Sequence, residues 1–192
     1  MSENKIDLTK EKIILGLDPG TNIMGFGLII VKGKEEPSVL QYGIIRLEHY
    51  DDHTIKLQKI FEKVSQIIRE FLPDEVAIEA PFYGKNVQSM LKLGRAQGVA
   101  IAAAINKGVP VVEYAPKKVK QSVTGNGNAS KEQIAAMLMK ILKFSHTEEF
   151  LDATDALGVA LCHHYQSVSL FPKSQSANGW AEFLKKNPSR LK

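Results

Sequence analysis

Residues 13–31, with the sequence IILGLDPGTNIMGFGLIIV, decide the fold. They contain two apolar runs, and Asp18, Pro19 and Gly20 stand between them. Short apolar runs that are bounded by proline and glycine are typical of buried β-strands. Residues 39–47 form a third such run, so the chain is expected to begin with three strands in an antiparallel meander.

Downstream of the meander, the apolar residues recur at spacings that alternate between those of a helix and those of a strand. Ser130 with Gln133, and Ser145 with Glu148, match the capping box that begins a helix. This order predicts an α/β fold, with a mixed five-stranded sheet flanked by helices on both faces. The predicted helices are residues 54–72, 86–106, 116–123, 130–143 and 145–166, and the further strands are residues 75–79 and 109–114.

The predicted helix 86–106 is unusually thin, because glycine and alanine occupy much of its length, Gly94 and Gly98 among them. Small side chains allow close approach of a neighbouring element. The helix is therefore expected to pack either against the sheet or against a second copy of itself.

Length and composition indicate one compact domain. The chain has 192 residues, of which 44% are hydrophobic, and this suits a single folded core. We expect that core at residues 13–166, after an N-terminal extension at residues 1–12 and before a basic, loosely ordered tail at residues 167–192. The single cysteine excludes an internal disulfide framework. No apolar run is long enough to cross a membrane, and residues 1–12 lack the apolar core of a secretory signal, so a cytoplasmic location is expected.

Charge is unevenly distributed along the chain. Residues 82–143 contain ten Lys and Arg against two Asp and Glu, whereas residues 144–170 contain four acidic residues and no Lys or Arg. A basic segment beside an acidic one suits a surface that binds a polyanion near a group of carboxylates. Lysines that merely solvate helix faces would give the same counts, so charge alone leaves both interpretations open.

Four carboxylates are expected to meet at one edge of the sheet. Asp18 ends the first predicted strand and Glu79 ends the fourth, and ligands of open α/β sheets bind beyond such strand ends. Asp152 and Asp155 are three residues apart on the last predicted helix, so they project from the same face. Because that helix is otherwise apolar, its two acids need neutralisation by basic groups from elsewhere or by cations.

Carboxylate oxygens without cysteine or histidine favour a hard divalent ion, Mg²⁺ or Mn²⁺. Two such ions would polarise a phosphodiester, activate water and stabilise the leaving oxygen. Each acid also has a simpler explanation: Asp18 could be a turn residue, Glu79 a solvated strand end and Asp155 a local ion-pair partner. The combination of two strand ends with a diacidic helix face resembles the arrangement of ribonuclease H-like nucleases.

Three blocks of sequence carry a more specific resemblance. They are IILGLDPGTNIMGFG at residues 13–27, the block AIEAPFYGKNVQ through SKEQI at residues 77–134, and LDATDALGVALCH at residues 151–163. In order and spacing these blocks resemble the RuvC family of bacterial Holliday-junction resolvases, over about residues 13–166.

The resemblance implies a ribonuclease H-like fold and a crossover junction endodeoxyribonuclease. Such an enzyme acts in homologous recombination and DNA repair, as a homodimer that cuts two symmetry-related strands of four-way junction DNA. It uses Mg²⁺, for which Mn²⁺ can substitute, with two ions per subunit expected, and the branch-migration proteins RuvA and RuvB are the expected partners. The family's four acidic residues correspond to Asp18, Glu79, Asp152 and Asp155, which are thus the expected catalytic residues and metal ligands.

The resemblance also implies supporting residues. The family's junction-probing aromatic residue corresponds to Phe82, whose ring could stack on an unpaired base. The two basic residues near the family's active site correspond to Lys120 and Lys131, which are expected to contact phosphates. Lys85, Lys117 and Lys118 are further candidates for DNA contacts, although a solvated face explains them equally. His163 and His164 follow the aspartates on the same helix, and either a structural or a supporting role is open for them.

Two other classes of function stay open at this point. A phosphotransferase of the actin and sugar-kinase type has a similar Asp-x-Gly-Thr turn, which residues 18–21 imitate, but normally needs two such domains. A catalytically idle junction-binding protein is the third possibility, and the presence of all four acids argues against it.

Overall fold

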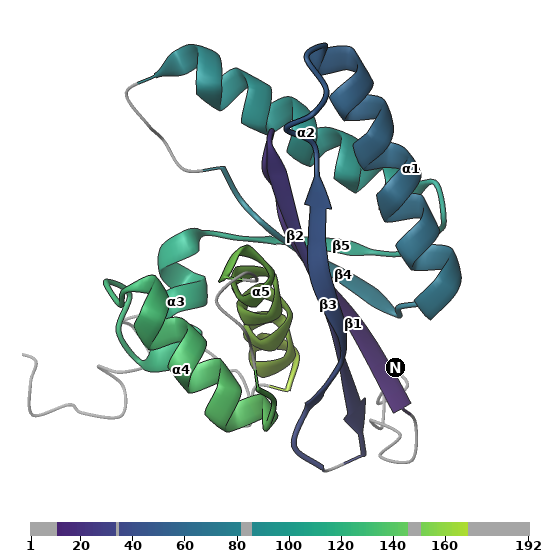
Figure 1. Cartoon of the computed structure of the whole chain (residues 1–192). Helices are drawn as coiled ribbons and strands as arrows, with labels where there is room; N and C mark the ends of the chain where they lie inside the picture. The colour runs from purple at the N-terminus through teal and green to yellow at the C-terminus, as the bar shows by residue number, and fades with distance from the viewer. Residues whose placement is uncertain (1–10, 34, 82–85, 146–150, 169–192) are drawn as a thin grey trace, which may run out of the picture.

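The computed structural model describes residues 11–33, 35–81, 86–145 and 151–168. A five-stranded sheet lies at the centre, with the strand order β3-β2-β1-β4-β5. Helices cover both of its faces, as the sequence predicts (Figure 1). The strands are β1 (Glu11–Asp18), β2 (Ile23–Lys32), β3 (Ser38–Arg46), β4 (Glu75–Glu79) and β5 (Val111–Tyr114), and the helices are α1 (His53–Phe71), α2 (Val87–Ile105), α3 (Pro116–Thr124), α4 (Lys131–Leu142) and α5 (Leu151–Ser167).

The strand pairing confirms the predicted meander. β1 pairs antiparallel with β2, and β2 pairs antiparallel with β3. β4 lies parallel to β1 on the other side, with Gly16 opposite Ala77, and β5 continues the parallel half of the sheet. The ends of β1, β4 and β5 therefore meet at the same edge of the sheet.

One face of the sheet is covered by α1 and α2. Leu15, Leu17 and Leu28 belong to the buried core on this face, together with apolar residues of α1 and small residues of α2. α1 is capped at its N-terminus by Asp52, whose side chain accepts hydrogen bonds from the backbone N–H groups of Thr54 and Ile55. The buried side of α2 contains alanines at positions 96, 100, 103 and 104, so that part of the thin helix packs within the chain.

The other face of the sheet is covered by α5, which packs unusually closely. A Cβ atom added at Gly16 would lie 2.0 Å from the backbone oxygen of Ala156, and one added at Gly27 would lie 2.8 Å from Leu157. Only glycine fits under the helix at these two positions, because any side chain would force α5 away from the sheet. α3 and α4 pack on α5, and Val119, Ile134 and Leu138 complete a second buried core there (Figure 1).

Most of the observed helix caps and helix ends agree with those predicted from the sequence. The predicted capping box of Ser130 and Gln133 is present at the start of α4. The second predicted capping box pairs Ser145 with Glu148, and Glu148 lies outside the described residues. In the described part of the chain, no helix combines the length and the apolar character that a membrane span needs.

Candidate active site

Asp18 and Glu79 occupy neighbouring strand ends, as predicted. The pairing of β1 with β4 places Leu17 opposite Ile78, and each acid is the next residue along its strand. Side chains alternate along a strand, so Asp18 lies on the same face as Gly16, and Glu79 on the same face as Ala77. Gly16 contacts α5, and Ala77 belongs to the core beneath it. Both carboxylates therefore lie on the α5 face.

α5 brings Asp155 to these two strand ends. Asp155 is the residue before Ala156, which rests directly on Gly16, and its side chain is largely buried, at 15% exposure. Asp152 lies one helical turn earlier in α5, and its side chain is outside the described part of the chain. The close packing of helix on glycine thus places an acidic helix turn next to an acidic strand edge.

The neutralising group for Asp155 comes from α4. The ammonium nitrogen of Lys131 lies 2.7 Å from Oδ2 of Asp155. Lys131 is the first residue of α4, directly after the capping residue Ser130, so the cap fixes where its backbone stands. The sequence left open whether basic groups or cations would balance the acids of α5, and for Asp155 this structure provides a lysine.

Glu79 lies in an environment that disfavours its ionised form. Burial, together with the negative charge of Asp155, raises the pKa of Glu79 to about 7, and the positive charges of Lys131 and Lys120 offset part of this rise. The charges of Asp155 and Glu79 are therefore close enough to repel each other, although they come from different elements. A carboxyl group with a pKa near neutrality is typical of functional sites.

A cavity of about 690 Å³ opens beside Glu79. It lies between the ends of β4 and β5, the start of α3 and the loop before α4. Lys120 is partly buried at its side, and its ammonium group donates a hydrogen bond of 2.9 Å to the backbone oxygen of Ala129. The cavity is lined by Glu79, Ala80, Pro81, Ala115, Pro116, Lys117, Lys120, Gly127 and Asn128.

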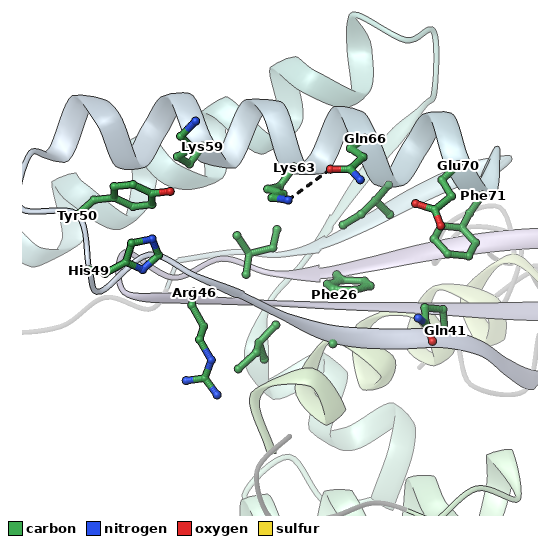
Figure 2. A pocket seen from close by; sticks show the side chains of 14 residues that line it. Phe26, Gln41, Arg46, His49, Tyr50, Lys59, Lys63, Gln66, Glu70 and Phe71 are labelled. Atoms are coloured by element: carbon green, nitrogen blue, oxygen red, sulfur yellow. Dashed lines mark hydrogen bonds between the residues drawn. The ribbon is translucent and has the colours of Figure 1, made fainter.

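Another cavity, of about 670 Å³, lies on the opposite face of the sheet between β3 and α1 (Figure 2). Its basic side chains have local partners: Arg46 lies 3.4 Å from Glu48, and Lys63 donates to Gln66 at 3.4 Å. The acidic edge faces α5, whereas this cavity faces α1, so the two are separated by the sheet.

The carboxylate oxygens of Asp18, Glu79 and Asp155 are the donors that a hard divalent cation prefers. Within the described residues, no three acidic, histidine or cysteine side chains are drawn together tightly enough to enclose a metal ion. Lys131 instead supplies positive charge at Asp155. The donor chemistry thus fits a divalent ion, provided that the lysine moves away from the aspartate.

The structure brings together five of the ten predicted site residues: Asp18, Glu79, Asp155, Lys120 and Lys131. Lys117 lines the adjoining cavity, whereas Lys118 is exposed on α3 and is not among the cavity's lining residues. Phe82 and Lys85 lie outside the described residues. Sequence reasoning missed the cavity residues Pro116 and Asn128, because a proline at a helix start and an asparagine in a loop carry no signal beyond that of a helix start or a turn.

Comparison with known proteins gives a consistent result. The family model described as "Crossover junction endodeoxyribonuclease RuvC" matches residues 14–163. A protein of that name from Cytophaga hutchinsonii is 62% identical over 184 residues, covering 96% of this chain and 90% of the relative. One from Porphyromonas gingivalis is 50% identical, covering 95% of this chain and 98% of the relative.

Solved structures agree with the sequence relatives. The structure described as T. thermophilus RuvC in complex with Holliday junction substrate superimposes with a TM-score of 0.75 at 31% identity, covering 81% of this chain and 94% of that one. The yeast mitochondrial Holliday junction resolvase Ydc2 shares the fold, with a TM-score of 0.56 at 14% identity.

Proposed function

The chain belongs to the family of the crossover junction endodeoxyribonuclease RuvC, and on that premise we propose that its acidic sheet edge is the site where junction DNA is hydrolysed. The fold is ribonuclease H-like, and the enzyme is a nuclease that resolves Holliday junctions. Family membership thus favours the endonuclease over the phosphotransferase and over the idle binding protein. The observation that carries the site assignment is the meeting of Asp18, Glu79 and Asp155 at one edge, on the face where α5 packs.

The catalytic residues and metal ligands in this proposal are Asp18, Glu79, Asp152 and Asp155. The family is in general dependent on divalent metal, and we propose Mg²⁺, with two ions per subunit and with Mn²⁺ as a substitute. The chemistry that bound divalent ions supply is polarisation of the phosphate and activation of water. In this proposal the protein would contribute carboxylates from β1, β4 and α5, and the contact of Gly16 with Ala156 supports the position of the neighbouring Asp155.

Lys131 has two partners in turn in this proposal. In the structure its ammonium group pairs with Asp155. If divalent ions were bound at the carboxylates, the ammonium group of Lys131 could turn to a DNA phosphate, at the N-terminus of a helix whose N–H groups also favour anions. Glu79, with its pKa near 7, loses its proton when positive charge arrives beside it.

DNA is proposed to approach along the basic side of the site. Lys120 and Lys117 line the cavity beside Glu79, and a strand that passes there would place a phosphate between the lysines and the acids. Lys85, Lys118 and the stacking ring of Phe82 are proposed as further DNA contacts on the basis of family resemblance. These contacts would make binding strongly dependent on salt.

A homodimer is proposed through the outer side of α2. Val87, Leu91 and Ile105 are 63%, 54% and 63% exposed, and a Cβ atom added at Gly94 or Gly98 would meet nothing within 4 Å. These five residues recur at helical spacing, so they form one apolar and nearly flat stripe. Leu91→Glu is expected to give a monomer by light scattering at micromolar concentration, and a dimer that survives this change would refute the interface.

The remaining assignments follow the family resemblance. We propose that residues 13–166 form the nuclease domain, with residues 1–12 and 167–192 as flanking segments. RuvA and RuvB are the proposed partners. Because a junction resolvase acts on chromosomal DNA in recombination and repair, the proposed location is the cytoplasm.

A gel assay with a synthetic four-way junction tests the proposal. Mg²⁺ should produce paired nicks at symmetry-related positions, and a linear duplex of the same sequence should stay intact. Equal cutting of duplex and junction, or cutting that persists in EDTA, would contradict the proposed function.

A further inference from the structure

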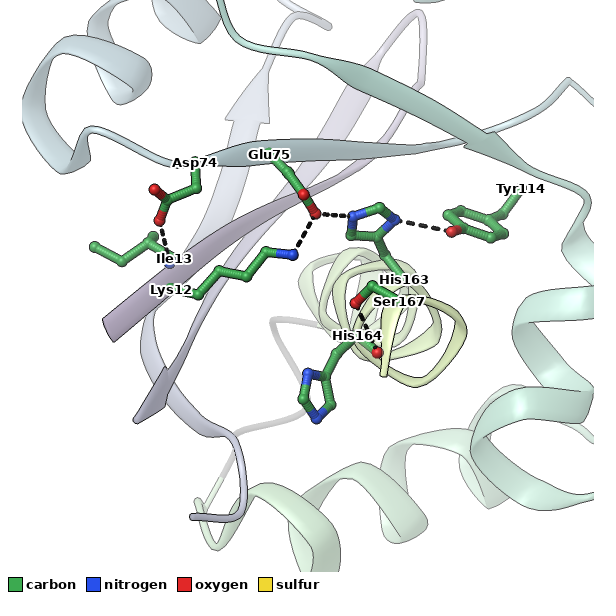
Figure 3. A network of polar contacts seen from close by, with 8 residues as sticks. All are labelled: Lys12, Ile13, Asp74, Glu75, Tyr114, His163, His164 and Ser167. Carbon is green, nitrogen blue, oxygen red and sulfur yellow. Dashed lines mark hydrogen bonds and ion pairs between the residues drawn. The ribbon is translucent and has the colours of Figure 1, made fainter. Parts of the chain in front are cut away.

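A chain of polar contacts ties the C-terminal half of α5 to β4 and β5 (Figure 3). His163 of α5 is only 5% exposed, and both of its ring nitrogens have partners. Nδ1 lies 2.8 Å from the hydroxyl oxygen of Tyr114, and Nε2 contacts the carboxylate of Glu75. Lys12 of β1 lies 2.7 Å from the same carboxylate.

Each donor in this chain can be matched with an acceptor. A carboxylate only accepts, so Nε2–H of His163 donates to Glu75. In the neutral ring Nδ1 then accepts from the hydroxyl of Tyr114. Because each group is satisfied only in one relative placement of helix and strands, the network fixes geometry in a way that apolar packing at the same place would not.

The network is connected to the acidic edge in two ways, through Tyr114 and through helix α5. Tyr114 is the register partner of Glu79, on the neighbouring strand. His163 follows Asp155 by eight residues on the same helix, which corresponds to about 12 Å along its axis. The polar tie therefore acts on the helix that carries Asp155 and on the strand next to Glu79.

The two sides of α5 are held by different means. Toward β1 and β2, Gly16 and Gly27 let the helix backbone rest on the sheet. Close packing of this kind has no preferred direction, so it resists separation of helix and sheet better than it resists rotation or tilting of the helix. Toward β4 and β5, the hydrogen bonds of His163 supply the directional contact.

From this geometry we propose that His163 is a positioning residue for junction cleavage: through Glu75 and Tyr114 it sets the angle of α5, and thus the placement of Asp155 relative to Glu79. The inference rests on the proposed function of the acidic edge. A tilt of about 5° at His163 would move Asp155 by about 1 Å over the distance between them, and displacements of this size cost up to about a hundredfold in rate.

The test compares His163→Leu with the matched control His164→Leu. His164 is the adjacent residue of α5 and is also buried, at 8% exposure, but it is outside the tie to Glu75 and Tyr114. Single-turnover cleavage of a four-way junction by each full-length variant is measured with saturating enzyme, alongside junction affinity in EDTA and urea unfolding. His163→Leu is expected to cleave about 10-fold to 100-fold more slowly than wild type, with junction affinity within about twofold.

Two more variants separate positioning from mere stability. His163→Gln retains one donor and one acceptor, so it should recover most of the rate. Tyr114→Phe removes a single hydroxyl group, so this variant should fold and still test the network if His163→Leu does not fold. Cleavage at the wild-type rate by Tyr114→Phe, or equal rates for His163→Leu and His164→Leu at equal folded fraction, would overturn the proposal.

Calorimetric titration of Mn²⁺ into the DNA-free proteins distinguishes failure of this inference from failure of the proposed function. Weaker Mn²⁺ binding by His163→Leu than by His164→Leu supports positioning of the acidic residues even if the wild-type protein cuts no junction. Equal Mn²⁺ binding by the two variants counts against positioning, whatever the cleavage assay shows.

Discussion

Replacing Glu79 by glutamine is expected to stabilise the metal-free protein above neutral pH and to change its stability little at acidic pH. Burial, followed by the charge of Asp155, raises the pKa of Glu79 from 4.5 to about 7. In the pH range between these two values the folded state binds more protons at this site than the unfolded state does. Stability contributed by the protonated group is therefore lost as the pH rises from about 4.5 to 7, and the loss is complete above that range.

The size of the effect follows from the two pKa values. A tenfold change in proton affinity corresponds to about 1.4 kcal/mol, so a rise from 4.5 to about 7 corresponds to at most about 3 kcal/mol. Glutamine has nearly the same shape and no charge, so Glu79→Gln removes the cost of ionisation. The free energy of unfolding of the variant should exceed that of the wild type by up to about 3 kcal/mol at pH 8.

Urea unfolding in EDTA at pH values from 5 to 8 measures this difference. Taking the variant minus the wild type at each pH cancels the contributions of the other titrating groups. Glu70→Gln removes the same charge from an exposed position of α1 and should give a difference that is nearly independent of pH. A gap for Glu79→Gln that is the same at pH 5 and pH 8, or that favours the wild type at pH 8, would refute the reasoning.

Three further changes test the packing and the charges of the site. Gly16→Ala should lower the free energy of unfolding by about 1–3 kcal/mol or more and slow cleavage, because the added Cβ would lie 2.0 Å from a backbone oxygen of α5. Gly158→Ala, where the nearest atom is 3.5 Å away, is the tolerated control, and equal urea unfolding of the two variants would disprove the close-packing argument. Lys131→Ala removes the ammonium group beside Asp155. Calorimetry should therefore show tighter Mn²⁺ binding by the DNA-free variant, while cleavage of the junction should slow. Unchanged Mn²⁺ affinity would speak against competition between the lysine and the metal. Lys117→Ala should reduce the slope of log affinity against log salt by about 1 in junction-binding titrations, and an unaltered slope would mean that Lys117 contacts no phosphate.

The architecture was predictable because it follows from local patterns. Residues 13–31 carry two apolar runs around a Pro-Gly turn, and they form β1 and β2 of the meander. Apolar and polar residues alternate at residues 75–79, and this pattern placed Glu79 at the end of a strand. Asp18 is two residues after Gly16, so the two share one face of their strand, and the same spacing relates Glu79 to Ala77. The parallel pairing of β1 with β4 confirms that part of the prediction.

Long-range contacts account for what the sequence did not reveal. Nothing local indicates that Lys131 would neutralise Asp155, since the two residues are joined only by the packing of α4 on α5. The same holds for His163, whose partners Glu75 and Tyr114 belong to different strands. The apolar positions of α2 were visible, but their exposure on the outer side depends on how the helix is rotated against α1.

The most direct test of the acidic edge as the cleavage site is Asp18→Asn, assayed for binding and for cutting on the same four-way junction. The neutral amide keeps the shape of the strand end but weakens its hold on a divalent ion, so junction affinity in EDTA should match the wild type while nicks in Mg²⁺ fall to background. Wild-type cutting by the folded variant, or a loss of affinity as large as the loss of cutting, would show that the reaction takes place elsewhere.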